Sequence, residues 1–394
     1  MSEWVSTTLG KIFAVDNTKL GPHVEEPTVM SLSKYAGFVR ADEYFDKRIA
    51  SSNLDAYKVV ELGEWAFSTI HIDEGSIARN NLGERGVISP MYTTMRFVST
   101  DCIPEYAELL VRQPGMLAEY SRRAQGSINR RRSLPFKAFA EIVVALPSKA
   151  QQRSIVEVIA AMDAQIAALG EELIRLGPLR VRLFLDSDDL DYVAVDRVAS
   201  VSQGKALPKR VQGEHSGDVS WFKIADMTGS GNKDGYTRAE TRLTLEQINS
   251  LKGVVVPAGS VVFPRVGAAV LTEKKRILDV DAAVDENHLV LTPREGVSAE
   301  CLLAAVESIR LAELVQTGAV PSLNMGLLRS AQIPWSIKAN DRLNDALCEM
   351  RASTRGLRAE LADLHTFRSA LMTSLLNQEI EIPESYNSLL EEVS

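Results

Sequence analysis

Two long stretches of the chain carry apolar residues at alternating intervals of four and three. This spacing is the a/d seam of a heptad repeat, which predicts a helix whose partner is another helix. A helix packed on its own domain usually carries a broader apolar stripe. We therefore expect two helices, each about 30 residues and roughly 45 Å long, paired as an antiparallel coiled coil. The seam residues are Ile155, Ile159, Met162, Ile166, Leu169, Leu173 and Leu176, and then Leu343, Leu347, Met350, Thr354, Leu357, Leu361, Leu364 and Leu371.

The two seams share one register. Each position of the second seam from Leu343 to Leu364 lies 188 residues after its counterpart in the first, and Arg180 with Arg368 and Leu183 with Leu371 continue the match. The region before each helix contains a Gly-x-x-x-Phe step, Gly63 to Phe67 and Gly259 to Phe263, and ends on an apolar residue followed by proline. Two unrelated helices would seldom agree in phase and length, so the chain is interpreted as a duplicated unit with a pseudo-twofold internal repeat.

Short β-like runs bounded by Gly, Pro and Asn lie upstream of both helices, at 58–60, 65–67, 254–256, 261–263 and 288–291. They predict an α+β protein with two α/β domains joined by the helices. The expected divisions are a first domain at 1–147, a first helix at 148–186, a second domain at 187–334, a second helix at 335–378 and an acidic tail at 379–394. Gly177 and Pro178 predict a kink or short break in the first helix.

The composition is that of a globular protein, with 394 residues of which 45% are hydrophobic and 24% charged. No apolar run approaches the length of a membrane helix, and the first residues do not resemble a signal peptide. Cys102, Cys301 and Cys348 show no metal-ligand spacing, so we expect them to pack as reduced thiols in a cytoplasmic protein.

The formal net charge of −8 does not favour a nucleic-acid partner, but its distribution is uneven. Residues 101–145 contain seven Lys or Arg against five Asp or Glu, and residues 200–279 contain twelve against eight. Two basic regions in an acidic chain can still contact phosphates.

Known catalytic and cofactor motifs are missing. The chain has no phosphate-binding loop, no dinucleotide fingerprint and no motif of an adenine methyltransferase, and its five histidines form no zinc-binding pair. We therefore expect no catalytic residue, no metal site and no cofactor bound by this chain.

Several segments resemble specificity subunits of type I restriction-modification systems. The run from Leu146 to Arg153 resembles the start of their first spacer helix, and Arg368 to Gln378 resembles the end of their second. Gly86 to Tyr92 and Pro257 to Phe263 resemble parts of their target-recognition domains. The likeness covers essentially the whole chain, and the order of the segments makes it specific.

This resemblance implies a non-catalytic subunit that reads a bipartite site on double-stranded DNA, with each domain reading one half and the helices setting the spacing. It also implies two methyltransferase subunits and restriction/translocase subunits as partners, which would hold S-adenosylmethionine and ATP.

Arginine can contact guanine and Asn or Gln can contact adenine, and all of these side chains, like lysine, can hold phosphate. The candidate DNA contacts are the side chains of this kind in glycine-flanked loops. Tyr35, Trp221 and Tyr236 could also contact bases, but aromatic residues are more often core. The candidates in the first half are Arg79, Asn80, Asn81, Arg122, Arg123, Gln125, Asn129, Arg130, Arg131 and Arg132, and those in the second are Gln203, Lys205, Lys209, Arg210, Lys223, Arg265, Lys274, Lys275 and Arg276.

Two other functions remain open from the sequence. One is a coiled-coil adaptor that binds only proteins, against which the two basic regions argue. The other is a DNA-modifying enzyme with an unrecognised active site, against which the missing motifs argue.

Overall fold

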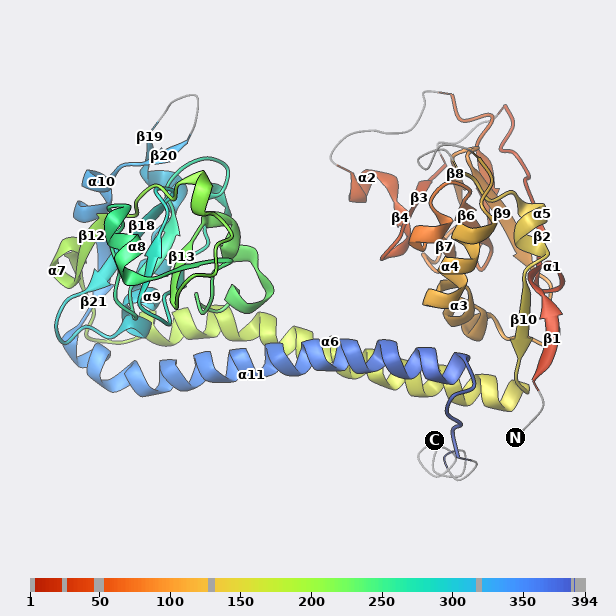
Figure 1. Cartoon of the computed structure of the whole chain (residues 1–394). Helices are drawn as coiled ribbons and strands as arrows, with labels where there is room; N and C mark the ends of the chain where they lie inside the picture. The colour runs from red at the N-terminus through yellow and green to blue at the C-terminus, as the bar shows by residue number, and fades with distance from the viewer. Residues whose placement is uncertain are drawn as a thin grey trace. The chain divides into compact units, whose positions relative to one another are not determined.

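The computed structural model describes residues 4–22, 27–45, 53–126, 132–316, 321–383 and 386 (Figure 1). The chain forms two compact units: unit 1 is Met1–Ile166 with Asp363–Ser394, and unit 2 is Ala167–Ala362. The long helices α6 (Lys149–Leu185) and α11 (Ile337–Leu376) each contribute one end to each unit. They contain 37 and 40 residues, so both are longer than the heptad seams alone indicated.

The two long helices run in opposite directions. In unit 1, Ile155 and Ile159 near the beginning of α6 share an apolar cluster with Leu375 near the end of α11. In unit 2, Phe184 at the end of α6 shares a cluster with Leu347 near the beginning of α11. Every seam residue is buried or half-buried. The predicted antiparallel seam is therefore confirmed.

The short break predicted at Gly177 and Pro178 is wrong, because α6 continues through Pro178 as helix, and the alternative of a kink stays a prediction. A proline removes one intrahelical hydrogen bond, which neighbouring contacts can offset. Such contacts flank Pro178 in the sequence. Leu176, before it, is half-buried, and Arg180, after it, forms an ion pair with Glu307 (2.5 Å).

Unit 1 contains two four-stranded sheets, ordered β2-β9-β6-β7 and β4-β3-β8-β5, and a β1-β10 pair. In Figure 1 the red β1 lies beside the yellow β10, which leads into α6. The strands are β1 (Val5–Thr8), β2 (Phe13–Val15), β3 (Val29–Ser33), β4 (Gly37–Arg40), β5 (Lys58–Val60), β6 (Trp65–Ser68), β7 (Ile77–Arg79), β8 (Gly86–Ile88), β9 (Tyr92–Phe97) and β10 (Val143–Leu146). The shorter helices are α1 (Leu9–Ile12), α2 (Ala41–Tyr44), α3 (Pro104–Arg112), α4 (Pro114–Arg123) and α5 (Phe136–Ala140).

Unit 2 contains sheets ordered β12-β18-β15-β16 and β14-β13-β17, and the pairs β11-β21 and β19-β20. The strands are β11 (Asp191–Ala194), β12 (Ala199–Gln203), β13 (Val219–Phe222), β14 (Thr241–Leu243), β15 (Val261–Pro264), β16 (Arg276–Ile277), β17 (Ala282–Val284), β18 (His288–Pro293), β19 (Val315–Gln316), β20 (Ser322–Leu323) and β21 (Gln332–Trp335). The shorter α-helices are α7 (Val195–Val198), α8 (Leu245–Ser250), α9 (Ala299–Glu307) and α10 (Met325–Ser330).

The order of strands repeats between the units. The sheet β2-β9-β6-β7 corresponds to β12-β18-β15-β16, and the pair β1-β10 to β11-β21. The parallel pair β3-β8 corresponds to β13-β17, and the bridge between Val256 and Ala282 takes the place of the β5-β8 ladder. Both units mix helices with mainly antiparallel strands, so the α+β class and the internal repeat are confirmed.

A buried amide ties each domain to its long helix at equivalent places. Gln152 of α6 accepts a hydrogen bond from the Ile103 amide and donates to the Asp101 carbonyl (both 2.8 Å). Asn340 of α11 lies 188 residues later, accepts from the Ser298 amide (2.8 Å) and donates to the Gly296 carbonyl (3.0 Å). Because a buried polar group costs free energy unless it is bonded, each amide fixes its long helix to the segment that begins α3 or α9.

The repeated Gly-x-x-x-Phe steps are the turns into β6 and β15. Gly63 has φ +79° and Gly259 has φ +84°, a left-handed conformation that glycine adopts at little cost. Four of the five β-like runs are strands. The prediction for 254–256 is wrong apart from a single bridge at Val256, because the following Pro257 has no amide hydrogen to extend a ladder.

The prediction that all three cysteines pack is wrong for Cys348, which is exposed, and confirmed for Cys102 and Cys301, which are buried. Burial raises the pKa of Cys102 to about 12 and that of Cys301 to about 11. Partial burial also raises the pKa of Cys348. Because Cys348 is nevertheless the exposed thiol, iodoacetamide at pH 8 is expected to modify it on the order of tenfold faster than the other two. Peptide mass spectrometry over a time course measures this, and equal rates at all three sites would contradict the described burial.

Among the described helices none is long and apolar enough to cross a membrane.

Candidate nucleic-acid interface

In unit 2, three candidate residues meet at the turn between β17 and β18. Gln203, at the end of β12, donates from Nε2 to the Glu286 carbonyl (3.0 Å). Arg265, directly after β15, donates from Nε to the same carbonyl (3.1 Å). The Lys205 amide donates to the Val284 carbonyl (3.0 Å), and its side chain is exposed. The fold thus brings the side-chain amide of Gln203 and the guanidinium of Arg265 to one turn, with the backbone of Lys205 beside them.

Gly204 makes this meeting possible. A Cβ at this position would collide with the carbonyl oxygens of Val284 and Asp285. Only a residue without a side chain lets β12 pass this close to the turn.

A buried polar chain lies under the turn. His288, which has no exposed surface, contacts Asp285 through Nδ1 (2.7 Å) and the Tyr236 hydroxyl through Nε2 (2.9 Å). Burial opposes ionisation of Asp285, but the His288 and Asn287 hydrogen bonds prevail and hold the pKa of this carboxyl below its ordinary value. Sequence reasoning missed Asp285 and His288. The four polar residues from Asp285 to His288 between two apolar strands were a usable signal for a turn.

Three further candidates of unit 2 are Lys223, which is next to a residue bonded to this turn, and the exposed Lys209 and Arg210. Lys223 forms an ion pair with Glu240 (3.0 Å), and the following amide, of Ile224, donates to Asp285 (3.4 Å). Lys209 and Arg210 are exposed on a single 3-10 turn, Lys209–Val211. Lys209 and Arg210 can contact an external anion from where they lie, whereas Lys223 would have to exchange Glu240 for it.

The structure removes Lys275 from the candidate contacts. Lys275 is 5% exposed, and its ammonium donates to the Ile309 carbonyl (3.0 Å) and pairs with Glu273 (3.4 Å). Burial lowers the pKa of both Lys275 and Arg276, and Arg276 Nη1 donates to the Lys275 carbonyl (2.8 Å). Lys274 and Arg276 are half-buried and stay candidates.

In unit 1, the candidates that follow β7 are already bonded. Asn80 is fully buried and donates to the carbonyls of Glu61 (3.1 Å) and Glu84 (2.9 Å), so it shapes the loop and is also removed from the candidates. Arg79 pairs with Glu105 (2.7 Å), and Asn81 donates to Glu108 (3.1 Å). Either side chain would have to exchange a carboxylate for DNA.

Arg79 and Asn81 also line a cavity of about 670 Å³ in unit 1. Arg112 and Arg368 lie on its wall as well. Arg112 Nη2 donates to the Lys34 carbonyl (2.5 Å), and Arg368 forms a two-pronged ion pair with Asp163.

The second cluster of unit 1 lies at the end of α4. Arg122 and Arg123 both bind Glu119 and hold the pKa of its carboxyl at about 2. Arg132 donates to the Ser121 and Ala124 carbonyls (each 2.8 Å), which caps the last turn of α4. Gln125 is exposed. Asn129, Arg130 and Arg131 lie outside the described residues.

The three aromatic candidates differ in burial. Trp221 and Tyr236 are fully buried, as the core interpretation predicted, whereas Tyr35 is 81% exposed. In the described part of the chain, no group of three or more His, Cys, Asp or Glu side chains is placed to hold a metal ion.

Comparison with known proteins finds likeness in structure only. No family model and no curated protein matches this chain. A chain from a study of complex assembly and conformational transition of the type I R-M system superposes with a TM-score of 0.56 and 14% identity, covering 95% of this chain and 97% of that one. The type I restriction-modification S subunit from M. genitalium superposes with a TM-score of 0.54 and 11% identity, covering 95% and 96%. The chain therefore has the fold of type I restriction-modification specificity subunits, as its sequence motifs predicted.

Proposed function

We propose that this chain is the DNA-recognition subunit of a type I restriction-modification complex. In this proposal each domain reads one half of a bipartite site, and α6 with α11 sets the distance between the halves. Methyl transfer and cleavage, with S-adenosylmethionine and ATP, belong to partner subunits that assemble on this chain.

The observation that carries the proposal is the repeat itself. Each domain repeats the same sheets and is tied to its own long helix by an equivalent buried amide, Gln152 or Asn340. Reading duplex DNA at two places requires two readers at a fixed separation, and paired helices hold a distance that a flexible linker would not.

The charge distribution supports DNA as the ligand. The net charge is −8, yet Lys205, Lys209 and Arg210 are exposed and follow within seven residues of Gln203, which with Arg265 binds the turn between β17 and β18. Such a mixture suits contact with both phosphates and base edges.

Replacing Lys205, Lys209 and Arg210 together with alanine is expected to weaken duplex binding and its dependence on salt. The slope of log K against log salt should become shallower by about 0.9 for every phosphate that these side chains neutralise in the wild type. Fluorescence anisotropy with the full chain and a labelled duplex, from low to moderate salt, measures the slope.

Arg175→Ala is the matched control, because this side chain is 78% exposed on α6 and pairs only within the helix, with Glu171. Its slope should equal that of the wild type. An unchanged slope in the triple variant would remove this surface from the DNA contact.

A further inference from the structure

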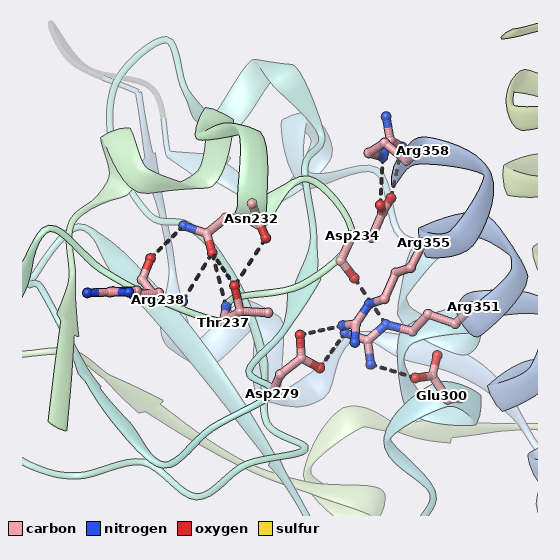
Figure 2. Close-up of polar contacts among 10 residues, drawn as sticks. Asn232, Asp234, Thr237, Arg238, Asp279, Glu300, Arg351, Arg355 and Arg358 are labelled. Carbon is pink, nitrogen blue, oxygen red and sulfur yellow. Dashed lines mark hydrogen bonds and ion pairs between the residues drawn. The ribbon is translucent and has the colours of Figure 1, made fainter. Parts of the chain in front are cut away.

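Three arginines on α11 are directed at the second domain. Arg351, Arg355 and Arg358 are spaced four and three residues apart, so they share one face of the helix. Figure 2 shows their side chains reaching the carboxylates of Asp234, Asp279 and Glu300. We call these six residues the arginine clamp.

The clamp is a connected network. Arg351 binds Glu300 through Nη1 and Asp279 through Nη2, both at 2.8 Å. Arg355 binds the other oxygen of Asp279. Arg358 forks onto both oxygens of Asp234, at 2.6 and 2.8 Å. Two-pronged pairs of this kind fix direction as well as distance.

The three carboxylates and Arg351 are largely shielded from water, whereas the side chains of Arg355 and Arg358 are 39% and 32% exposed. The side chains of Arg351 and Glu300 are 11% and 7% exposed, and those of Asp234 and Asp279 are 15% and 16% exposed. Exposed ion pairs are weak, whereas removing one partner of a shielded pair leaves a charge without compensation. The clamp therefore resists being opened.

The loop opposite α11 is shaped to admit the arginines. A Cβ at Gly235 would collide with the guanidinium of Arg351 and the carboxylate of Asp279. Asn232, 6% exposed, holds the loop closed by donating to the Asp226 carbonyl (3.1 Å) and the Arg238 carbonyl (3.0 Å). Figure 2 shows Asn232 beside Arg238 and Thr237.

Hydrogen bonds also connect the clamp to the turn between β17 and β18, which Gln203 and Arg265 bind. The Asp279 amide donates to the Tyr236 carbonyl (2.9 Å), next to Gly235. The Tyr236 hydroxyl reaches His288, which holds Asp285 in the turn. These bonds join the clamp to the residues under the turn, so the clamp positions the turn together with the rest of the domain on α11.

On α6, which the structure describes throughout, no arginine stands at the positions equivalent to the three clamp arginines. The positions 188 residues before the three arginines are Asp163, Ala167 and Gly170. A second ion pair of unit 2 also differs between the domains. Glu307, the last residue of α9, pairs with Arg180 of α6, whereas the last residue of α3 is Arg112. The clamp is therefore a property of the second domain and not a requirement of the repeated fold.

We propose that Arg351, Arg355 and Arg358 are positioning residues, which hold the second domain in one orientation on α11 and so restrict the half-site spacings that the chain accepts. This inference rests on the proposed DNA-reading function. The clamp contacts no base in this proposal, so opening it changes the accepted spacing and leaves the bases read at each half unchanged.

Two variants test the clamp without removing its most buried arginine. Arg355→Gln with Arg358→Gln removes two of the charges. Gly235→Ala keeps every charge but obstructs the arginines. Gly231→Ala is the matched control in the same loop, because its Cβ would approach only the Thr237 hydroxyl, at 3.8 Å. Each full-length chain is used to select duplexes from a random library, and amide hydrogen exchange is followed in the segment 229–238.

Both clamp variants are expected to select the wild-type bases at each half while their preference for the wild-type spacing over neighbouring spacings falls on the order of tenfold. Exchange in 229–238 should rise by about tenfold, and Gly231→Ala should match the wild type in both measurements. An unchanged spacing preference, or altered bases at either half, overturns the inference. If the wild type selects no paired half-sites, the proposed function is wrong. In that case the hydrogen-exchange measurement tests the positioning role by itself. An unchanged exchange rate of 229–238 in the clamp variants overturns that role.

Discussion

Replacing Leu347 with aspartate is expected to destabilise the folded chain by about 3–5 kcal/mol. Leu347 has no exposed surface and packs in the core of unit 2, in the cluster that includes Phe184 of α6. The substitution removes an apolar side chain from this core and places a carboxylate where no partner is arranged for it. Urea unfolding of the full chain, followed by circular dichroism, measures the decrease in the free energy of unfolding.

Position on the helix surface provides the control for this prediction. Ile174 of α6 is 74% exposed, so Ile174→Asp should change the free energy of unfolding by no more than about 0.5 kcal/mol. Leu361 is a seam residue that is only half-buried, and Leu361→Asp should fall between the two. Equal stabilities for Leu347→Asp and Ile174→Asp would show that the seam is not a buried interface.

The repeat and the helix pair could be predicted from sequence because both depend on periodicity. A seam such as Ile155 and Ile159 repeats every few residues, and its second copy follows at a constant interval of 188. The turns at Gly63 and Gly259 were visible for a similar reason, since a glycine at a fixed place before a strand marks a conformation that few other residues adopt.

The candidate contacts were predicted less well because residue type does not reveal burial. Lys275 and Asn80 have the chemistry of DNA-binding residues, but tertiary packing encloses both and satisfies them with main-chain carbonyls. The arginine clamp shows the same limit. The spacing of Arg351, Arg355 and Arg358 can be seen in the sequence, but their carboxylate partners lie 51 to 124 residues away.

Exchanging one domain is expected to change one half of the DNA target and leave the other half intact. A mismatch at each of three base pairs costs about 1–3 kcal/mol per pair, so a chimera should discriminate against the original half-site by at least about a hundredfold. Replacing 1–147 with the same region of a chain that reads another site should alter one half only. Replacing 191–335 should alter the other. Selection of duplexes by each chimera, or mapping of methylated sites in a cell that supplies the partner subunits, measures the outcome.

The structure sets the boundaries of these exchanges. Val5 pairs with Leu146 and Asp191 with Trp335, so each segment must carry both strands of its ladder. The second segment must also supply carboxylates for the arginine clamp, because α11 stays in the recipient. A donor with acids at the positions of Asp234 and Asp279 should keep the original spacing, and a donor without them should read its new bases with a broader spacing. If either exchange altered both halves of the target, the two domains would not be separate readers, and the proposed function would have to be abandoned.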